Sequence, residues 1–212
     1  MANAPRRPQD ELEECHPKAS PPLPLLIMNI PKQTDQQLVF ITVGGISPPY
    51  REVKNYIFKK THLIETSGGR LHGMGVAEET HSCGCQLKQA NIITLICSNY
   101  YNAWGIFEAL RLNYEFPHDV DYFIVDLCNF PGNATEYPLM EISLYEVRNI
   151  PRFNELYVSE LPALVRDHNG HLIAGTSEIG MTMGTLKYKY CTISQWKRKA
   201  DYHVYCERGK WF

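Results

Sequence analysis

An apolar run, Leu38-Val39-Phe40-Ile41-Thr42-Val43, is the strongest sign of regular structure in the sequence. Six apolar or β-branched residues in succession predict a strand that is buried on both faces. Two glycines end the run, and Ser47-Pro48-Pro49 after them suits the first turn of a helix, because serine caps that turn and proline fits inside it. Residues 61–66 predict a second strand. We therefore expect a strand–helix–strand unit whose two strands pair in parallel.

A longer set of elements is expected from residue 91 onward. It comprises a strand, a helix, a strand, a helix and a hairpin, at residues 92–97, 103–114, 120–127, 138–149 and 156–174. The turn at residues 167–170 contains asparagine and glycine, which is the signal for the hairpin. Strands that alternate with helices predict the α/β class, here with a mixed central sheet.

This order of elements resembles the thioredoxin/glutaredoxin-like fold superfamily. In that family a cis proline opens the hairpin, and Leu161-Pro162-Ala163-Leu164-Val165 followed by residues 169–175 is similar to that hairpin. The same segment is similar to the corresponding part of glutathione transferases. The resemblance implies a thioredoxin-like mixed sheet flanked by helices.

Redox members of this family carry two cysteines at the turn between the first strand and the first helix. Two stretches of this chain suit that turn, and they read Ser47-Pro48-Pro49-Tyr50 and Tyr101-Asn102-Ala103-Trp104. Neither holds a sulfur, and thiol–disulfide exchange needs an activated thiolate. The resemblance therefore implies a redox-inactive module for protein–protein interaction or scaffolding, not a conventional oxidoreductase. A glutathione-dependent transferase or reductase is an alternative. The expected binding residues are Ser47, Tyr50, Tyr101, Trp104 and Pro162.

Four potential metal ligands, His72, His81, Cys83 and Cys85, lie in or beside a glycine-rich stretch. Imidazole and thiolate are the ligands that tetrahedral zinc prefers. The spacing argues the other way, because one residue separates Cys83 from Cys85 where structural zinc sites have about two to four. Three interpretations stay open: the zinc site of a regulatory protein, a redox-active cysteine pair, and a loop without chemistry.

Residues 186–212 are basic and aromatic, with seven lysines and arginines against two acidic residues. Cationic side chains interleaved with rings suit single-stranded nucleic acid or an acidic partner. The alternative is a pair of amphipathic strands that turn their rings inward and their charges to water. The basic residues singled out for binding are Lys197, Arg198, Lys199, Arg208 and Lys210.

Composition limits the remaining classes. Hydrophobic residues make up 44% and charged residues 21%, as in folded proteins, and the net charge of -2 gives no overall attraction to nucleic acid or membrane. Seven cysteines argue against a fully paired disulfide framework. We find no secretory signal or membrane span, so we expect a cytoplasmic or nuclear protein with reduced thiols.

The expected organisation has four parts. Residues 1–34 form a flexible arm, residues 35–90 a βαβ half-module with the His/Cys loop, residues 91–185 the thioredoxin-like core, and residues 186–212 the basic extension. No cofactor is expected apart from the zinc and glutathione alternatives.

Overall fold

The computed structural model describes residues 34–44, 48–78, 89–116, 120–179, 181–184, 186 and 188–208. In chain order the elements are β1 (Gln37–Val43), α1 (Tyr50–Lys59), α2 (Thr61–Thr66), β2 (Gly69–Val76), β3 (Asn91–Cys97), α3 (Tyr100–Leu110), α4 (Leu112–Glu115), β4 (Val120–Asp126), β5 (Leu139–Tyr145), α5 (Ile150–Phe153), the π-helix η1 (Asn154–Val158), α6 (Leu161–Asp167), β6 (Gly170–Glu178), β7 (Met181–Met183), β8 (Tyr190–Trp196) and α7 (Lys199–Arg208). The predicted N-terminal arm lies outside the described residues except for Thr34. None of the helices described is long and apolar enough to span a bilayer.

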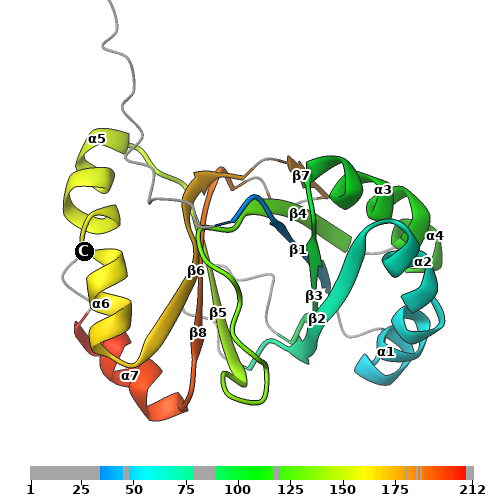
Figure 1. Ribbon diagram of the computed structural model, residues 1–212, viewed down its shortest axis with the longest axis horizontal. Coiled ribbons are helices and arrows are strands. Elements are labelled where there is room, and N and C mark those ends of the chain that lie inside the picture. The colour runs from blue at the N-terminus through cyan, green and yellow to red at the C-terminus, as the bar shows by residue number, and fades with distance from the viewer. Residues whose placement is uncertain are drawn as a thin grey trace, which may run out of the picture.

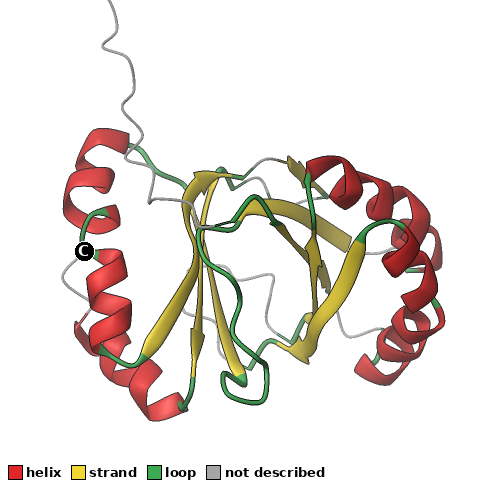
Figure 2. Cartoon of the chain, viewed as in Figure 1, coloured by secondary structure: helices red, strands yellow, loops and turns green. Residues whose placement is uncertain are grey.

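Two sheets lie face to face in the middle of the molecule. Sheet A has the strand order β2-β3-β1-β4-β7, and sheet B has the order β5-β8-β6. Helices α1 to α4 cover the outer face of sheet A, and α5, α6 and α7 cover the outer face of sheet B (Figure 1). The arrangement has four layers, helix–sheet–sheet–helix (Figure 2). The α/β class predicted from the sequence is therefore confirmed.

The strand pairing differs from the prediction. All the pairings between described strands are antiparallel, so the predicted parallel pairing and mixed sheet are wrong. β1 and β2 do run in the same direction, but β3 lies between them and pairs with both. This is the split βαβ arrangement, and a thioredoxin-like arrangement is not confirmed.

Three segments take a different secondary structure from the one predicted. Residues 61–66 form helix α2, because the buried Ile64 continues the buried helical face of α1. Residues 139–145 form strand β5, since Met140, Ile142 and Leu144 alternate toward sheet A. Residues 161–167 form helix α6, with Pro162 in its first turn, where the missing N–H costs nothing.

Two apolar cores hold the sheets in place. The core between the sheets contains Phe40 and Phe123, whose rings stack with centroids 4.3 Å apart. The core between sheet A and its helices contains Ile106 and Leu110 of α3. The side chain of Asn99 caps α3 by accepting a hydrogen bond from the Asn102 N–H at 2.9 Å.

The two halves of the chain repeat one pattern of strands and helices. The register of β2 with β3 shifts between Leu71 and Gly73, and the register of β6 with β8 shifts between Leu172 and Ala174. Each shift follows the third residue of its strand, so both strands carry the same bulge. A matching irregularity in two matching strands indicates that residues 37–110 and 139–208 repeat one arrangement, which we call the first and the second copy, whereas β4 has no counterpart among the described residues of the second.

The helices before these strands repeat as well. Gly68 and Asn169 each directly precede the bulged strand, and both have a positive φ, of 78° and 62°. Three residues on the preceding helices are buried at the same spacing in each copy. They are Val53, Ile57 and Ile64 in the first copy and Asn154, Val158 and Val165 in the second.

The copies are joined by backbone hydrogen bonds beyond the end of β4. The amides of Cys128 and Asn129 donate to the carbonyl of Ile173, at 2.9 and 3.3 Å. Ile173 is the bulged residue of β6, and a bulge leaves backbone groups free to bind a passing strand. The chain then crosses to the far edge of sheet B, where β5 begins.

Candidate functional site

The helix-facing positions of the two sheets carry opposite chemistry. In sheet A, Val39 pairs with Leu95 and Ile41 pairs with Ile93, and all four belong to the apolar core beneath α1 to α4. The register of β5 with β8 is the same, position for position. In sheet B these positions hold Glu141 opposite Ser194 and Ser143 opposite Thr192. The second copy therefore has polar residues where the first has aliphatic ones.

Glu141 is held by two serine hydroxyls. Ser143 Oγ donates to Oε1 of Glu141 at 2.7 Å, and Ser194 Oγ donates to Oε2 at 2.5 Å. The indole Nε1–H of Trp196 donates to Ser194 Oγ at 3.0 Å, which leaves the serine proton for the carboxylate. Each carboxylate oxygen can accept more than one hydrogen bond. Glu141 therefore has a fixed position and still has acceptor capacity.

Tyrosine hydroxyls lie beside this carboxylate. The hydroxyl of Tyr145 is 2.7 Å from that of Tyr157 and 3.3 Å from Oγ1 of Thr192. Burial raises the pKa of Tyr145 and of Tyr157, and the neighbouring tyrosine hydroxyls raise both further. Burial also raises the pKa of Tyr205, as does the charge of Glu141. These phenols stay protonated at neutral pH and can donate hydrogen bonds.

Aromatic rings surround the polar groups. Phe153 lies with its ring centroid 5.4 Å from Tyr145 and 5.2 Å from Tyr157, and Trp196 lies 4.7 Å from Tyr205. Tyr157 stands on the π-helix η1, a rare geometry that is frequent at functional sites. A mainly aromatic surrounding with a few placed polar groups is the composition of small-molecule sites.

The fold does not require these polar groups. A buried polar group costs free energy unless it is fully hydrogen-bonded, and an aliphatic side chain avoids that cost. The first copy shows that aliphatic residues suffice at the same positions of the same fold. We call Glu141, Ser143, Tyr145, Tyr157 and Ser194 the second-copy polar cluster. The sequence prediction missed all five, although the alternation in residues 139–145 could have indicated β5 and its two faces.

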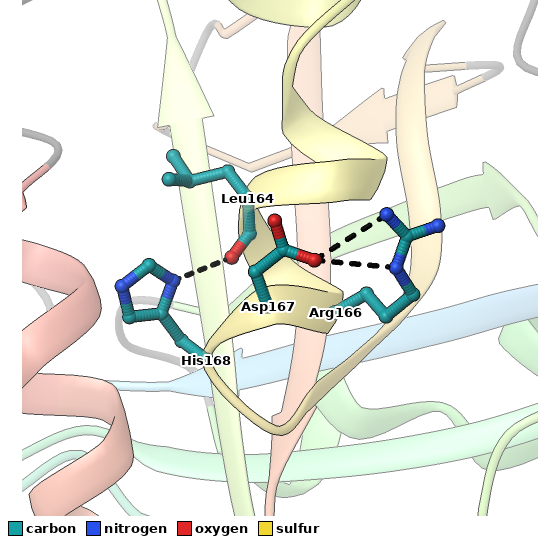
Figure 3. A network of polar contacts seen from close by, with 4 residues as sticks. All are labelled: Leu164, Arg166, Asp167 and His168. Atoms are coloured by element: carbon teal, nitrogen blue, oxygen red, sulfur yellow. Dashed lines mark hydrogen bonds and ion pairs between the residues drawn. The ribbon is translucent and has the colours of Figure 1, made fainter.

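A buried histidine, His168, lies at the C-terminal end of α6. Nδ1 of His168 lies 2.7 Å from the carbonyl oxygen of Leu164, and Arg166 forms an ion pair with Asp167 at 3.3 Å (Figure 3). A carbonyl oxygen only accepts, so Nδ1 carries the proton. The ring of His168 is buried against Tyr205, with centroids 6.4 Å apart. His168 therefore closes the helix end and anchors α7.

The predicted metal site is not assembled by the described residues. His81, Cys83 and Cys85 lie outside them. His72 is the bulged residue of β2, and its Nε2 lies 3.2 Å from Nε2 of Gln195 on β8. Burial and the charge of Arg70 lower the pKa of His72, so the neutral ring accepts from the amide. Among the residues the structure describes, no three potential ligands gather around one point.

The predicted binding residues do not share one surface. Ser47 lies outside the described residues. Tyr50 opens α1 and its hydroxyl donates to the carbonyl of Met74 at 3.4 Å. Tyr101 and Trp104 lie on the outer face of α3, 84% and 40% exposed. Pro162 lies on α6, and Figure 1 shows that α3 and α6 cover opposite faces of the molecule.

The basic residues near the C-terminus are largely paired with acidic ones. Lys197 contacts Glu136 at 2.6 Å, Arg198 contacts Asp201 at 2.8 Å, and Lys199 contacts Glu78 at 3.5 Å. The ring of Trp196 is buried, and so is that of Tyr205 on α7, in one apolar core. This favours the alternative in which the rings turn inward, although residues 199–208 form a helix where a strand was expected. Arg208 is the last residue of α7, and Lys210 lies outside the described residues.

Comparison with known proteins supports the fold alone. No protein-family model matches the chain, and no curated protein matches its sequence. The crystal structure of an anthrone oxidase-like protein is similar in fold, with a TM-score of 0.52. It shares 9% sequence identity, and the match covers 82% of this chain and 78% of that one. Identity at this level leaves the site to be argued from this chain's own residues.

Proposed function

We propose that the second copy binds a small aromatic organic molecule between sheet B and helices α5 to α7, and that Glu141 accepts a proton from it. The observation that carries the proposal is the chemical difference between the copies. Val39, Ile41 and Leu95 of sheet A are matched by Glu141, Ser143 and Ser194 of sheet B. Polar groups placed where the fold works without them are best explained by a ligand.

The chemistry is a reversible proton transfer. A C–H bond of a methylene group that is next to a carbonyl of the ligand, or joined to it through an aromatic ring, breaks and the proton goes to a carboxylate oxygen of Glu141. The electron pair moves, directly or through that ring, onto the carbonyl oxygen as an enolate. The protonated Glu141 returns the proton in the reverse step, so no oxidant or reductant is needed. The two serine hydroxyls keep the carboxylate in place, and positioned acid–base groups accelerate proton transfer by about 10²–10⁴-fold.

The choice of a first probe follows from the structural comparison. The similar structure belongs to an anthrone oxidase-like protein. Anthrone is a tricyclic aromatic ketone that enolises, which suits both the rings around Tyr145 and a carboxylate base. The proposal for this chain is limited to binding and proton transfer.

The test measures exchange of the methylene protons of anthrone in heavy water by NMR. The wild-type protein is expected to accelerate exchange, and Glu141→Gln is expected to remove the acceleration by at least about 10²-fold. Glu136→Gln is the matched control, because Glu136 is an exposed carboxylate that pairs with Lys197. Equal acceleration by wild type and by Glu141→Gln would show that Glu141 is not the base.

A second candidate is the protein-interaction module expected from the sequence. One observation supports it: Tyr101 is 84% exposed and Trp104 is 40% exposed, on one helix face. Tyrosine and tryptophan are enriched at the centres of interfaces. Cross-linking of the wild type, of Tyr101→Ser and of Trp104→Ser tests this candidate. Tyr114→Ser is the control, because Tyr114 lies on α4 and is 86% exposed. Partners retained by all variants would exclude this surface.

A further inference from the structure

The edge strands of the two sheets differ in how they are protected from pairing with a further strand. β2 is bulged between Leu71 and Gly73, and β7 has three residues. β6 is bulged as well, and the chain beyond β4 bonds to its Ile173 carbonyl. Bulges, short strands and covering segments are the means by which proteins prevent pairing at an edge. The remaining edge strand, β5, has none of these among the described residues.

β5 is a regular strand with one open side. All seven of its residues, Leu139–Tyr145, pair with β8 in one continuous register. None of them is a proline or a lysine, the residues that most often block an edge. Its one charged side chain, Glu141, is held by the hydroxyls of Ser143 and Ser194. No other described strand pairs with β5, so its outer edge can accept a strand along its whole length.

The neighbours of the matching strand show what fits at this edge. β5 matches β1 position for position, and β8 lies beside β5 as β3 lies beside β1. On its other side β1 pairs with β4, which runs antiparallel to it in a continuous register. The described part of the second copy has no strand in the place of β4. The open edge of β5 is therefore the position of an absent antiparallel strand.

The matching strand also identifies the backbone groups that point outward from β5. The Leu127 N–H donates to the Gln36 carbonyl at 3.1 Å. Bonding residues alternate along an antiparallel strand, so every second residue from Gln36 onward bonds toward β4. The matching residues of β5 are Met140, Ile142 and Leu144. Their N–H and C=O groups are therefore the ones available to a further strand.

We propose that two copies of the chain pair through β5, antiparallel to each other and about a two-fold axis at Ile142. The two sheets B then form one sheet, with three strands from each protomer. Ile142 is the middle residue of β5 and one of its outward-bonding residues, so an axis there pairs the whole strand. The inference does not rest on the proposed function.

The sequence of β5 is complementary to itself in this register. On the face toward sheet A, Ile142 lies opposite the partner's Ile142, and Met140 lies opposite the partner's Leu144, so that apolar residues meet. On the other face, Glu141 lies opposite the partner's Ser143. An axis at Glu141 would instead place two carboxylates directly opposite each other, which is unfavourable. The axis at Ile142 therefore gives every outward backbone group a partner and opposes no like charges.

The first measurement is the mass of the wild-type protein in solution by sedimentation equilibrium. The protein is expected to have twice the mass of one chain and to dissociate on dilution, because the edge of one seven-residue strand is a small interface. A wild type that is monomeric at every concentration would overturn the inference. The edge would then be left to a strand of another protein, or of this chain outside the described residues.

Cysteine cross-linking tests the register. Ile142→Cys is expected to form a disulfide-linked dimer under mild oxidation, since Cα atoms of a hydrogen-bonded pair lie about 5.5 Å apart. Met140→Cys is the matched control, because it lies on the same face of the same strand, but four residues of strand, roughly 13 Å, separate it from its equivalent in the partner. Met140→Cys combined with Leu144→Cys is expected to cross-link, because these two positions face each other across the axis.

Peptide mass mapping identifies the linked residues and separates these links from any made by the native cysteines. A dimer that is linked through Ile142→Cys, and not through Met140→Cys alone, supports the inference. A dimer without the Ile142→Cys link, or with an equal link through Met140→Cys alone, would overturn it, since the copies would then meet elsewhere or in another register. Each of these results leaves the proton transfer by Glu141 to its own test.

Discussion

Ser194 Oγ lies 2.5 Å from Oε2 of Glu141, at the register position where the first copy pairs Leu95 with Val39. One fold thus holds a hydrogen-bonded carboxylate and a plain aliphatic contact at matching positions. The first copy therefore serves as a reference for the second, because it shows that aliphatic side chains are compatible with the fold at these positions.

Exchanging the residues of one copy for those of the other separates their roles. Glu141→Val leaves the hydroxyls of Ser143 and Ser194 without their acceptor, so we expect the free energy of unfolding to fall by about 1–3 kcal/mol. Adding Ser143→Ile, the residue at the matching Ile41, is expected to restore part of that loss, because replacing both partners is less costly than replacing one. Ser194 is kept, since it accepts from Trp196.

Urea unfolding followed by tryptophan fluorescence measures both variants. A double variant that is less stable than Glu141→Val would contradict the expectation, since the unpaired Ser143 hydroxyl would then not account for the loss.

Two glycines should respond oppositely to the same substitution. A Cβ on Gly170 would lie 2.7 Å from Cζ3 of Trp196 and 2.7 Å from Cγ1 of Val165, so Gly170→Ala is expected to cost about 1–3 kcal/mol. Gly105, inside α3, has nothing within 4 Å of such a Cβ. Gly105→Ala is expected to stabilise the protein by about 0.5–1 kcal/mol. Chemical denaturation of both variants checks the contrast, and similar changes in the two would refute the close packing at Gly170.

The sequence predicted the buried strands well, because continuous apolar runs have few alternatives. β1, β3 and β4 lie where residues 38–43, 92–97 and 120–127 indicated them. Their order in the sheet was not predictable from the same runs. β3 inserts between β1 and β2, and a run of apolar residues is compatible with either a parallel or an antiparallel neighbour.

The elements with mixed polarity were misassigned for a different reason. In residues 139–145 the polar positions face helices and other polar groups, so neither face of β5 resembles a surface. Met140 and Leu144 also fit a helical spacing, which predicts the helix expected for residues 138–149. The candidate site could not be found for the same reason, since its signal is a difference between two copies whose residues have diverged.

Buried cysteines should resist alkylation. Burial raises the pKa of the Cys97 thiol to about 12, and burial also raises the pKa of Cys191, with Glu141 adding to it. Only the thiolate reacts, and at pH 8 a pKa of about 12 leaves roughly one thiol in 10⁴ ionised. We expect Cys97 and Cys191 to remain unmodified by iodoacetamide in the native protein and to react fully in urea, as peptide mass mapping would show. Native labelling of Cys97 at the rate of an unfolded thiol would contradict the described packing of β3.

Acid should weaken the start of α7 through Asp201. A hydrogen bond from Arg198 holds the pKa of Asp201 below its usual 3.8, and the charge of Arg198 and a hydrogen bond from Asn169 add to this. A carboxyl whose pKa is lower in the folded state contributes stability above pH 3.8, and that contribution is lost as pH falls through the folded value. Arg198→Gln is expected to move the Asp201 pKa back toward 3.8. The urea midpoint of this variant is then expected to fall less between pH 5 and pH 2 than that of the wild type.

Arg208→Gln, at the other end of the helix, is the control and should change neither the Asp201 pKa nor the pH dependence of the urea midpoint. Carboxyl-carbon NMR shifts measure the pKa directly, and a wild-type Asp201 that titrates at its usual value would show that the pairing with Arg198 does not form in solution.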